Sequence, residues 1–139
     1  MRVTRRYRFA ASHRLHSAAF TEDENRELYG KCSNPYGHGH DYVLDVTAEG
    51  PINPASGQVV HVPTLDRLVA EEVLQDFDHR YMNVDLGEFK KLVPTSENII
   101  RVIEDRLTAR WSDAFPGEWP RLEGIRLRET KRNVFELKS

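Results

Sequence analysis

The residues best suited to chemistry lie in one stretch, Cys32-Ser33-Asn34-Pro35-Tyr36-Gly37-His38-Gly39-His40. Five residues separate a single thiol from the first of two imidazoles. In an extended chain residues two apart share a face, so His38 and His40 are expected to point the same way. Gly37 and Gly39 keep the surroundings of these rings small, which lets a metal ion or a substrate approach the backbone. Two histidines do not complete a metal site, so a third ligand must come from elsewhere.

That third imidazole is available at the end of the segment Phe9-Ala10-Ala11-Ser12-His13. Three neutral imidazoles without a suitable fourth ligand describe a catalytic zinc site with one open position. Cys32 could be a fourth ligand, because thiolates bind zinc well. Alternatively it stands beside the metal as a base or nucleophile, with its pKa lowered by nearby positive charge. The competing interpretation is that the histidines bind no metal, since the chain has six of them.

Other titratable residues have both a chemical and an ordinary interpretation. In Asp78-His79 a carboxylate adjoins an imidazole that it could orient as a base, but a histidine at a helix C-terminus also suits the helix dipole. Glu97, in Thr95-Ser96-Glu97, is by default a carboxylate in the first turn of a helix. Glu129, taken alone, is an exposed charge in a probable strand.

Alternating residue types predict a half-buried strand from Arg2 to about Leu15. One face of it carries Val3, Arg5, Tyr7, Phe9 and Ala11. His13 has the same parity, so the strand is expected to continue its aromatic face with an imidazole.

The next segments read as a loop and a hairpin. Ser17 to Lys31 is polar and acidic, and its length makes it a surface loop that could act as a lid. Tyr42 to Ala48 is rich in strand formers. The turn cluster from Gly50 to Gly57 then predicts a hairpin whose returning arm is Gln58 to Val62.

Two helices and a final hairpin complete the predicted fold. Thr64 is expected to cap a helix ending near Asp76 to His79, and Thr95 or Ser96 a second one that runs to about Trp111. Their apolar stripes are Leu65, Leu68, Val69, Val73 and Leu74 in the first, and Ile99, Ile100, Val102, Ile103 and Leu107 in the second. Leu122 to Glu129 and Val134 to Leu137 form the hairpin. The order strand, strand, helix, helix, strand, strand favours an α+β fold with an antiparallel sheet.

Composition narrows the class of protein. A chain of 139 residues is expected to form one domain, residues 1–139. Its net charge of −2, with both signs mixed along the chain, argues against a nucleic-acid partner. The single cysteine excludes an intrachain disulfide. Without an apolar run of signal-peptide or membrane-spanning kind, the chain is expected to be cytoplasmic and to have no membrane association.

Five motifs, in this order along the chain, resemble those of the 6-pyruvoyl-tetrahydropterin synthase family, which also contains the 6-carboxytetrahydropterin synthases of queuosine biosynthesis. They are Phe9-Ala10-Ala11-Ser12-His13, Cys32-x5-His38-Gly39-His40, Asp78-His79-Arg80-Tyr81-Met82-Asn83, Pro94-Thr95-Ser96-Glu97-Asn98 and Arg128-Glu129-Thr130. The resemblance covers nearly the whole chain, from about Arg2 to Leu137.

The resemblance implies a tunnelling fold, in which a four-stranded antiparallel sheet carries two helices on one face. It further implies a homohexamer, a dimer of trimers whose sheets close into barrels, with active sites between subunits. Such closure would cover the sheet edges that a lone domain exposes.

The resemblance also implies residue roles. His13, His38 and His40 would hold Zn²⁺, and Cys32, Asp78 and His79 would transfer protons. Glu129 would bind the guanidine-like edge of a pterin, with Thr95, Ser96 and Glu97 contributing to the pterin pocket. The implied substrate is 7,8-dihydroneopterin triphosphate, and the implied reaction is elimination of triphosphate to give 6-pyruvoyl-tetrahydropterin. Arg14 and Lys31 are further expected triphosphate contacts, from charge and position.

Two alternatives remain open from the sequence. The five-residue gap between Cys32 and His38 looks like the pyruvoyl-forming branch, whereas Asp78 to Asn83 is closer to bacterial carboxy-forming enzymes, which release acetaldehyde. A hexamer that binds zinc and pterin without catalysis is the third hypothesis. The presence of a thiol, an imidazole and two carboxylates together counts against it.

Overall fold

The computed structural model describes residues 1–139, and its centre is a sheet of five strands in the order β3-β1-β2-β4-β5. The four long strands pair antiparallel and are β1 (Arg2–His13), β2 (His38–Glu49), β4 (Arg121–Arg128) and β5 (Val134–Lys138). The short β3 (Arg80–Tyr81) pairs parallel with β1. The α+β class is therefore confirmed, and the expectation of four strands, all antiparallel, was wrong. Two residues are too few for any periodic pattern, so the sequence carried no signal for β3.

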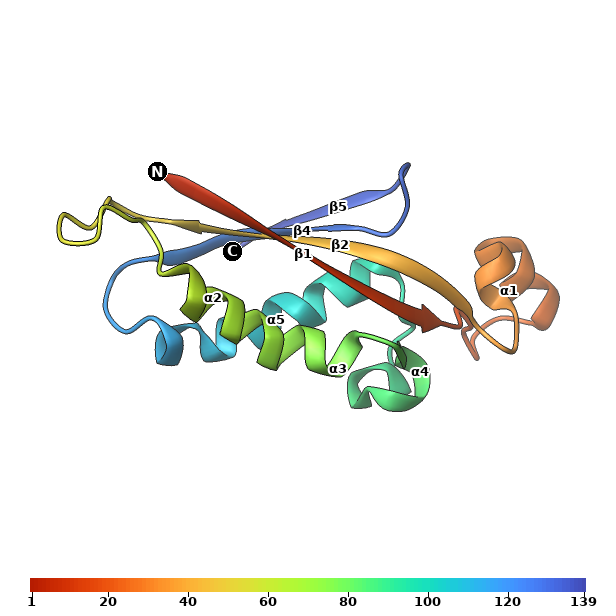
Figure 1. The fold of residues 1–139 in the computed structure, drawn as a ribbon. Helices are drawn as coiled ribbons and strands as arrows, with labels where there is room; N and C mark the ends of the chain where they lie inside the picture. Colours follow the sequence, from red (N-terminus) through yellow and green to blue (C-terminus); the bar gives the residue numbers. More distant parts are fainter.

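One face of the sheet is covered by helices and the other is open (Figure 1). The predicted alternation in β1 is confirmed, because Phe9, Ala11 and His13 are buried. Register pairs Phe9 with Tyr42 and His13 with His38. The Phe9 and Tyr42 rings stack with centroids 5.0 Å apart. This alternation places the last residue of β1 on the side that faces the helices.

The first long helix begins earlier than the sequence indicated. Helix α2 (Val62–Val69) starts after His61, continues through a π-helical segment (Ala70–Leu74) and ends with α3 (Gln75–Phe77). Thr64 is not the cap; its hydroxyl bonds to Nδ1 of His61 at 2.7 Å. Pro63 explains the shift, because a proline in the first turn removes no hydrogen bond and its φ already suits a helix.

The second long helix, α5 (Ser96–Ala114), begins as predicted and ends three residues later than expected. Thr95 is its N-cap, and its hydroxyl accepts a hydrogen bond from the Asn98 amide at 3.3 Å. The predicted apolar stripe is buried against the sheet, with Ile99, Ile103 and Leu107 fully buried. The final hairpin of β4 and β5 is also confirmed.

Two expectations for the connecting segments were wrong. The stretch from Ser17 to Lys31 contains helix α1 (Glu22–Tyr29), followed by a 3₁₀ turn (Gly30–Ser33). Thr21 and Glu24 form a capping box there, a helix signal hidden in the acidic run. The segment Gln58 to Val62 forms no strand, because β2 finds its partners in β1 and β4 instead.

A short helical connection lies between the two long helices. It follows β3 and consists of α4 (Met82–Asp85) and a 3₁₀ segment (Gly87–Lys90). Met82, Leu86 and Phe89 anchor it to the core. Helix α1 lies apart from the other helices, beyond the end of β1 (Figure 1). None of the helices has the length and apolar character needed to cross a membrane.

Candidate metal centre and active site

Strand register gathers the predicted metal ligands at one end of the sheet. His13 is the last residue of β1, and it pairs with His38, while Ala11 pairs with His40. The ring centroids of His13 and His40 lie 4.8 Å apart, as do those of His38 and His40. Cys32 reaches the same place from the 3₁₀ turn, with its sulfur 3.6 Å from Nε2 of His40. The three histidines predicted from sequence are therefore neighbours, and the thiol is with them.

Three of these side chains converge most closely. The ligand atoms of His13, Cys32 and His40 all lie within 4.8 Å of one another, and we call these residues the histidine–thiol group. His38 adjoins this group through the His40 ring but is outside it. The geometry thus offers two possible third ligands, His38 and Cys32, whereas the sequence suggested Cys32 only as a fourth.

The state of His13 fits a metal ligand. Its Nδ1 lies 2.9 Å from the carbonyl oxygen of Pro94, and a carbonyl only accepts, so Nδ1 carries the proton. Nε2 then presents a lone pair, and this atom is buried without a hydrogen-bond partner. Such a carbonyl partner commonly orients a metal-bound imidazole. A buried acceptor with no partner costs free energy, so a cation at this atom would complete the site.

Electrostatics also keep the imidazoles neutral, as metal ligands must be. Burial, followed by the neighbouring His40, lowers the pKa of His13 to about 4. Burial likewise lowers the pKa of His40, against the opposing pull of the Glu129 carboxylate. Both rings are therefore unprotonated at neutral pH and free to bind a cation.

The pKa of the Cys32 thiol depends on which charges are nearby. Burial and the nearby Glu129 carboxylate raise its pKa, so the protein alone favours the protonated thiol. The backbone of this turn is tied to the end of β1, since the Leu15 amide donates to the Cys32 carbonyl at 2.7 Å. A bound dication is the kind of charge that would reverse the shift and produce a thiolate.

Glu129 directly follows β4 and faces the same site. Its Oε1 lies 3.6 Å from Nε2 of His40, and its Oε2 accepts a hydrogen bond from the Ser96 hydroxyl. Ser96 is buried at the start of α5, next to the cap residue Thr95. Glu97 is exposed and joins none of these hydrogen bonds. Of the three helix-start residues predicted for a binding pocket, Ser96 hydrogen-bonds to this carboxylate, while the Thr95 hydroxyl caps the helix.

Asp78 and His79 form a pair of their own. Nδ1 of His79 lies 3.0 Å from Oδ1 of Asp78, and that oxygen also accepts from the Ala10 amide at 2.9 Å. The His79 side chain is 82% exposed. The pair therefore forms as predicted, but within one chain it makes no contact with Cys32.

Some site residues escaped the sequence reasoning. The hydroxyl of fully buried Tyr42 lies 3.4 Å from Nδ1 of His13. Tyr42 is two residues after His40 and so shares its face of the strand, a signal that the sequence did offer. The side-chain amide of Asn83 makes two hydrogen bonds to the backbone of Arg14. Its Oδ1 accepts from the Arg14 N–H at 2.7 Å, and its Nδ2 donates to the Arg14 carbonyl at 2.8 Å. The role of the Pro94 carbonyl had no sequence signal, because it depends on the fold alone.

Comparison with known proteins agrees with this arrangement. The sequence model of the family described as 6-pyruvoyl tetrahydropterin synthase matches residues 2–139. The chain is 38% identical to the 6-pyruvoyl tetrahydrobiopterin synthase of Poecilia reticulata over 95% of this chain and 86% of the relative. It is 43% identical to that of Homo sapiens over 76% of this chain and 72% of the relative.

A solved structure is also similar. The Caenorhabditis elegans 6-pyruvoyl tetrahydropterin synthase superposes with a TM-score of 0.89 at 35% identity, covering 100% of this chain and 95% of that one. The chain therefore belongs to the 6-pyruvoyl tetrahydropterin synthase family.

Proposed function

We propose that this chain, acting as one domain, is a zinc-dependent lyase that converts 7,8-dihydroneopterin triphosphate to 6-pyruvoyl-tetrahydropterin with elimination of triphosphate. The observation that carries the proposal is the convergence of an unpartnered buried Nε2, a thiol and a carboxylate at one end of the sheet, in a member of this family. A curated relative at 43% identity bears the name of this activity.

The proposed zinc ligands are His13, His38 and His40. The neutral state and carbonyl-oriented ring of His13 support this assignment, and Cys32 is the alternative third ligand. When bound, zinc supplies Lewis acidity, which acidifies the side-chain hydroxyls of the substrate and the carbon-bound protons beside them.

The remaining roles belong to side chains of the protein. Cys32, once ionised, removes a proton from the substrate side chain. Glu129 binds the donor edge of the pterin, as carboxylates read amino-bearing base edges. The hydroxyl of Ser96 orients this carboxylate, and we keep Thr95 and Glu97 as further residues of the pocket.

We propose a homohexamer, a dimer of trimers with the tunnelling fold, whose active sites lie between subunits. The exposed Asp78–His79 pair supports this, because it has no target within its own chain. In the assembly the pair would assist the Cys32 thiol of a neighbouring subunit as a proton-transfer partner. We further propose a cytoplasmic location, which suits a working thiol because thiols stay reduced there.

A basic surface of the protein near the proposed metal ligands suits the triphosphate of the substrate. A hollow of about 440 Å³ is lined by Arg26, Lys31 and His38 together with Ser33 and Asn34, and no carboxylate lines it. Arg14 lies in an adjoining hollow that also contains Arg26 and Ser33, together with one carboxylate, that of Glu22. Lys31 and Arg14 are therefore the proposed triphosphate contacts, and Arg26 joins them.

A product assay tests the proposal. Zinc-loaded protein receives 7,8-dihydroneopterin triphosphate, the products are identified by mass spectrometry, and Cys32→Ala is the control. A 6-pyruvoyl product with released tripolyphosphate, absent in the control, is expected. A 6-carboxy product with acetaldehyde would instead assign the chain to the queuosine branch. Tight pterin binding without turnover would identify a binding protein.

A further inference from the structure

The Asp78–His79 pair stands on a sharp bend that follows α3. His79 has φ = 61°, the left-handed region, and it is the only residue other than glycine with positive φ. Residues other than glycine adopt this conformation in only a few per cent of cases, asparagine, aspartate and histidine more often than others, and the surrounding structure must hold it. Here the His79 amide donates to the Ala10 carbonyl at 2.6 Å, so β1 holds the bend from one side.

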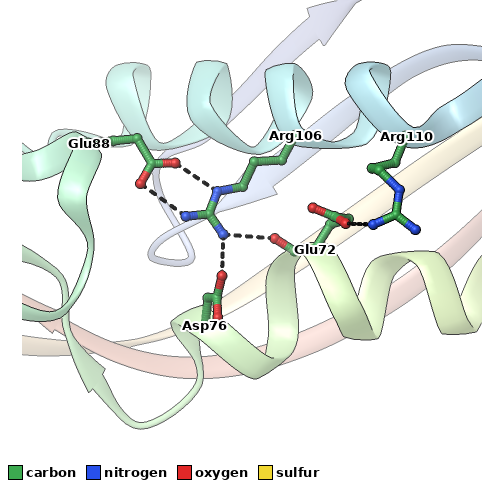
Figure 2. Close-up of polar contacts among 5 residues, drawn as sticks. All are labelled: Glu72, Asp76, Glu88, Arg106 and Arg110. Atoms are coloured by element: carbon green, nitrogen blue, oxygen red, sulfur yellow. Dashed lines mark hydrogen bonds and ion pairs between the residues drawn. The ribbon is translucent and has the colours of Figure 1, made fainter.

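Arg106 of helix α5 contacts residues that precede this bend and a residue that follows it (Figure 2). Before the bend, its Nη1 donates to Oδ2 of Asp76 at 2.6 Å and to the Glu72 carbonyl at 3.0 Å. After the bend, its Nε and Nη2 donate to the two oxygens of Glu88 at 2.8 and 3.0 Å. One guanidinium therefore joins the α2–α3 helix before the bend to the 3₁₀ segment Gly87–Lys90, which follows β3 and α4.

The guanidinium also packs against the residue next to the pair. Its central carbon lies 5.4 Å from the centroid of the Phe77 ring, within the range of a cation–π contact. Phe77 is fully buried and immediately precedes Asp78. The Arg106 side chain is only 19% exposed, so its contacts are shielded from solvent more than those of a surface ion pair.

Arg110, one turn further along α5, provides a natural comparison. It bonds to the Glu72 side chain at 2.6 Å (Figure 2). It also approaches Glu71 and Asp113. All of these partners lie before the bend or on α5 itself. Both arginines thus tie α5 to the α2–α3 helix, and only Arg106 reaches beyond the bend.

We propose that Arg106 is a positioning residue for the reaction, which holds the Asp78–His79 pair in its reactive orientation by joining Asp76 before the bend to Glu88 after it. The catalytic part of this inference rests on the proposed function, in which the pair transfers a proton. The structural part, that Arg106 holds the bend, stands without it.

The test compares Arg106→Gln with Arg110→Gln in the assembled, zinc-loaded protein. Amide hydrogen exchange of the segment 77–82 is followed by mass spectrometry, with β1–β2 peptides as an internal reference. Opening of the bend frees the His79 amide, so we expect its exchange to be about tenfold faster in Arg106→Gln and within about twofold of wild type in Arg110→Gln. Equal exchange in the two variants would overturn the proposal, because it would leave Arg106 a general helix-packing role.

Kinetics then test the consequence for catalysis. We expect Arg106→Gln to lower kcat about tenfold with KM within about threefold, since a displaced acid–base pair affects the transition state more than substrate binding. Arg106→Lys should recover part of kcat, because it keeps the charge but not the two-pronged contact with Glu88. Equal kcat values for Arg106→Gln and Arg110→Gln would refute the catalytic role.

Two further measurements distinguish a failure of the Arg106→Gln variant to assemble, and a failure of the proposed function, from a failure of the proposal for Arg106. If Arg106→Gln fails to assemble, Glu88→Gln removes only the contact after the bend and is expected to speed exchange of the His79 amide in the same way. If the wild-type protein shows no turnover, the proposed function fails, while the exchange measurement still decides whether Arg106 holds the bend.

Discussion

Helix α5 borders two polar clusters of opposite construction, one near its start and one at its middle. The Arg106 cluster, made of Arg106, Glu72, Asp76 and Glu88, gives every guanidinium nitrogen at least one acceptor. The histidine–thiol group of His13, Cys32 and His40 leaves Nε2 of His13 buried without a partner. The histidine–thiol group is the better shielded of the two, since the His40 side chain is 9% exposed, against 19% for Arg106 and 35% for Glu88.

The two clusters also differ in the charge states that their surroundings favour. Mutual ion pairs hold Arg106 in its charged state and keep the pKa of Glu88 below its usual range, so this cluster needs no further ligand. In the histidine–thiol group, burial instead favours the neutral form of His13 and of Cys32. Buried polar groups without a hydrogen-bond partner are rare unless a ligand binds to them. A divalent cation would bind both the imidazole lone pair of His13 and the sulfur of Cys32.

The largest expected effect comes from removing the unpartnered ligand. His13→Ala is predicted to weaken zinc binding by more than about 100-fold and to lower turnover by more than about 1000-fold. Metal content after dialysis, measured by mass spectrometry, checks this. His61→Ala, an exposed histidine at the start of α2, is the control and should keep its zinc. Full zinc occupancy in His13→Ala would mean that the orphaned nitrogen has another purpose.

Glu129→Gln probes the charge that faces the thiol. We expect kcat/KM to fall by about 100-fold, because the amide cannot accept two donors from a pterin edge. The same change should lower the Cys32 pKa, since the carboxylate contributes to raising it. The pH dependence of thiol alkylation in metal-free protein measures that shift, and Glu136→Gln on β5 serves as control. An unchanged alkylation profile would show that Glu129 does not act on the thiol.

Glu88→Gln tests whether the satisfied cluster contributes to stability rather than to metal binding. Its effect should be moderate, about 1–2 kcal/mol, because the carboxylate is partly exposed and water can replace part of the ion pair. Thermal unfolding at fixed protein concentration is expected to shift downwards by roughly 3–8 °C. Zinc content should not change. A loss of zinc equal to that of His13→Ala would contradict the separation of the two clusters.

The metal-free protein is also expected to show a pH-dependent stability. The pKa of His13 is about 4 in the folded state against 6.5 for the free side chain, so the unfolded chain binds one proton more between these values. Unfolding free energy should therefore fall as pH is lowered from about 6.5 towards 4. Denaturant unfolding at several pH values measures the slope. The His13→Gln variant should flatten it, and an equal slope would assign the effect to other groups.

Much of this architecture followed from patterns within short stretches of sequence. Alternation in β1 predicted that His13 continues the buried face of Phe9 and Ala11, and the structure confirms it. Helical periodicity and the Thr95 cap predicted α5. The capping box of α1 was equally local and was overlooked, because an acidic run also suits an exposed loop. Strand β3 had no pattern to find, since its hydrogen bonds come from a bend that passes the end of β1.

The sequence by itself indicated which residues have side chains suited to chemistry, and it determined which face of β1 and of the two long helices is buried, because these depend on residue type and on a period of two or 3.6. Only the tertiary structure decided that Cys32 stands within hydrogen-bond range of His40, that the Pro94 carbonyl selects the tautomer of His13, and that Arg106 spans the Asp78–His79 bend. His13 and Pro94 are 81 positions apart and Arg106 and Glu88 are 18 apart, while Cys32 and His40, only eight apart, meet because a turn returns the chain to β2. Strand register and helix packing set their distances, and no local pattern encodes either.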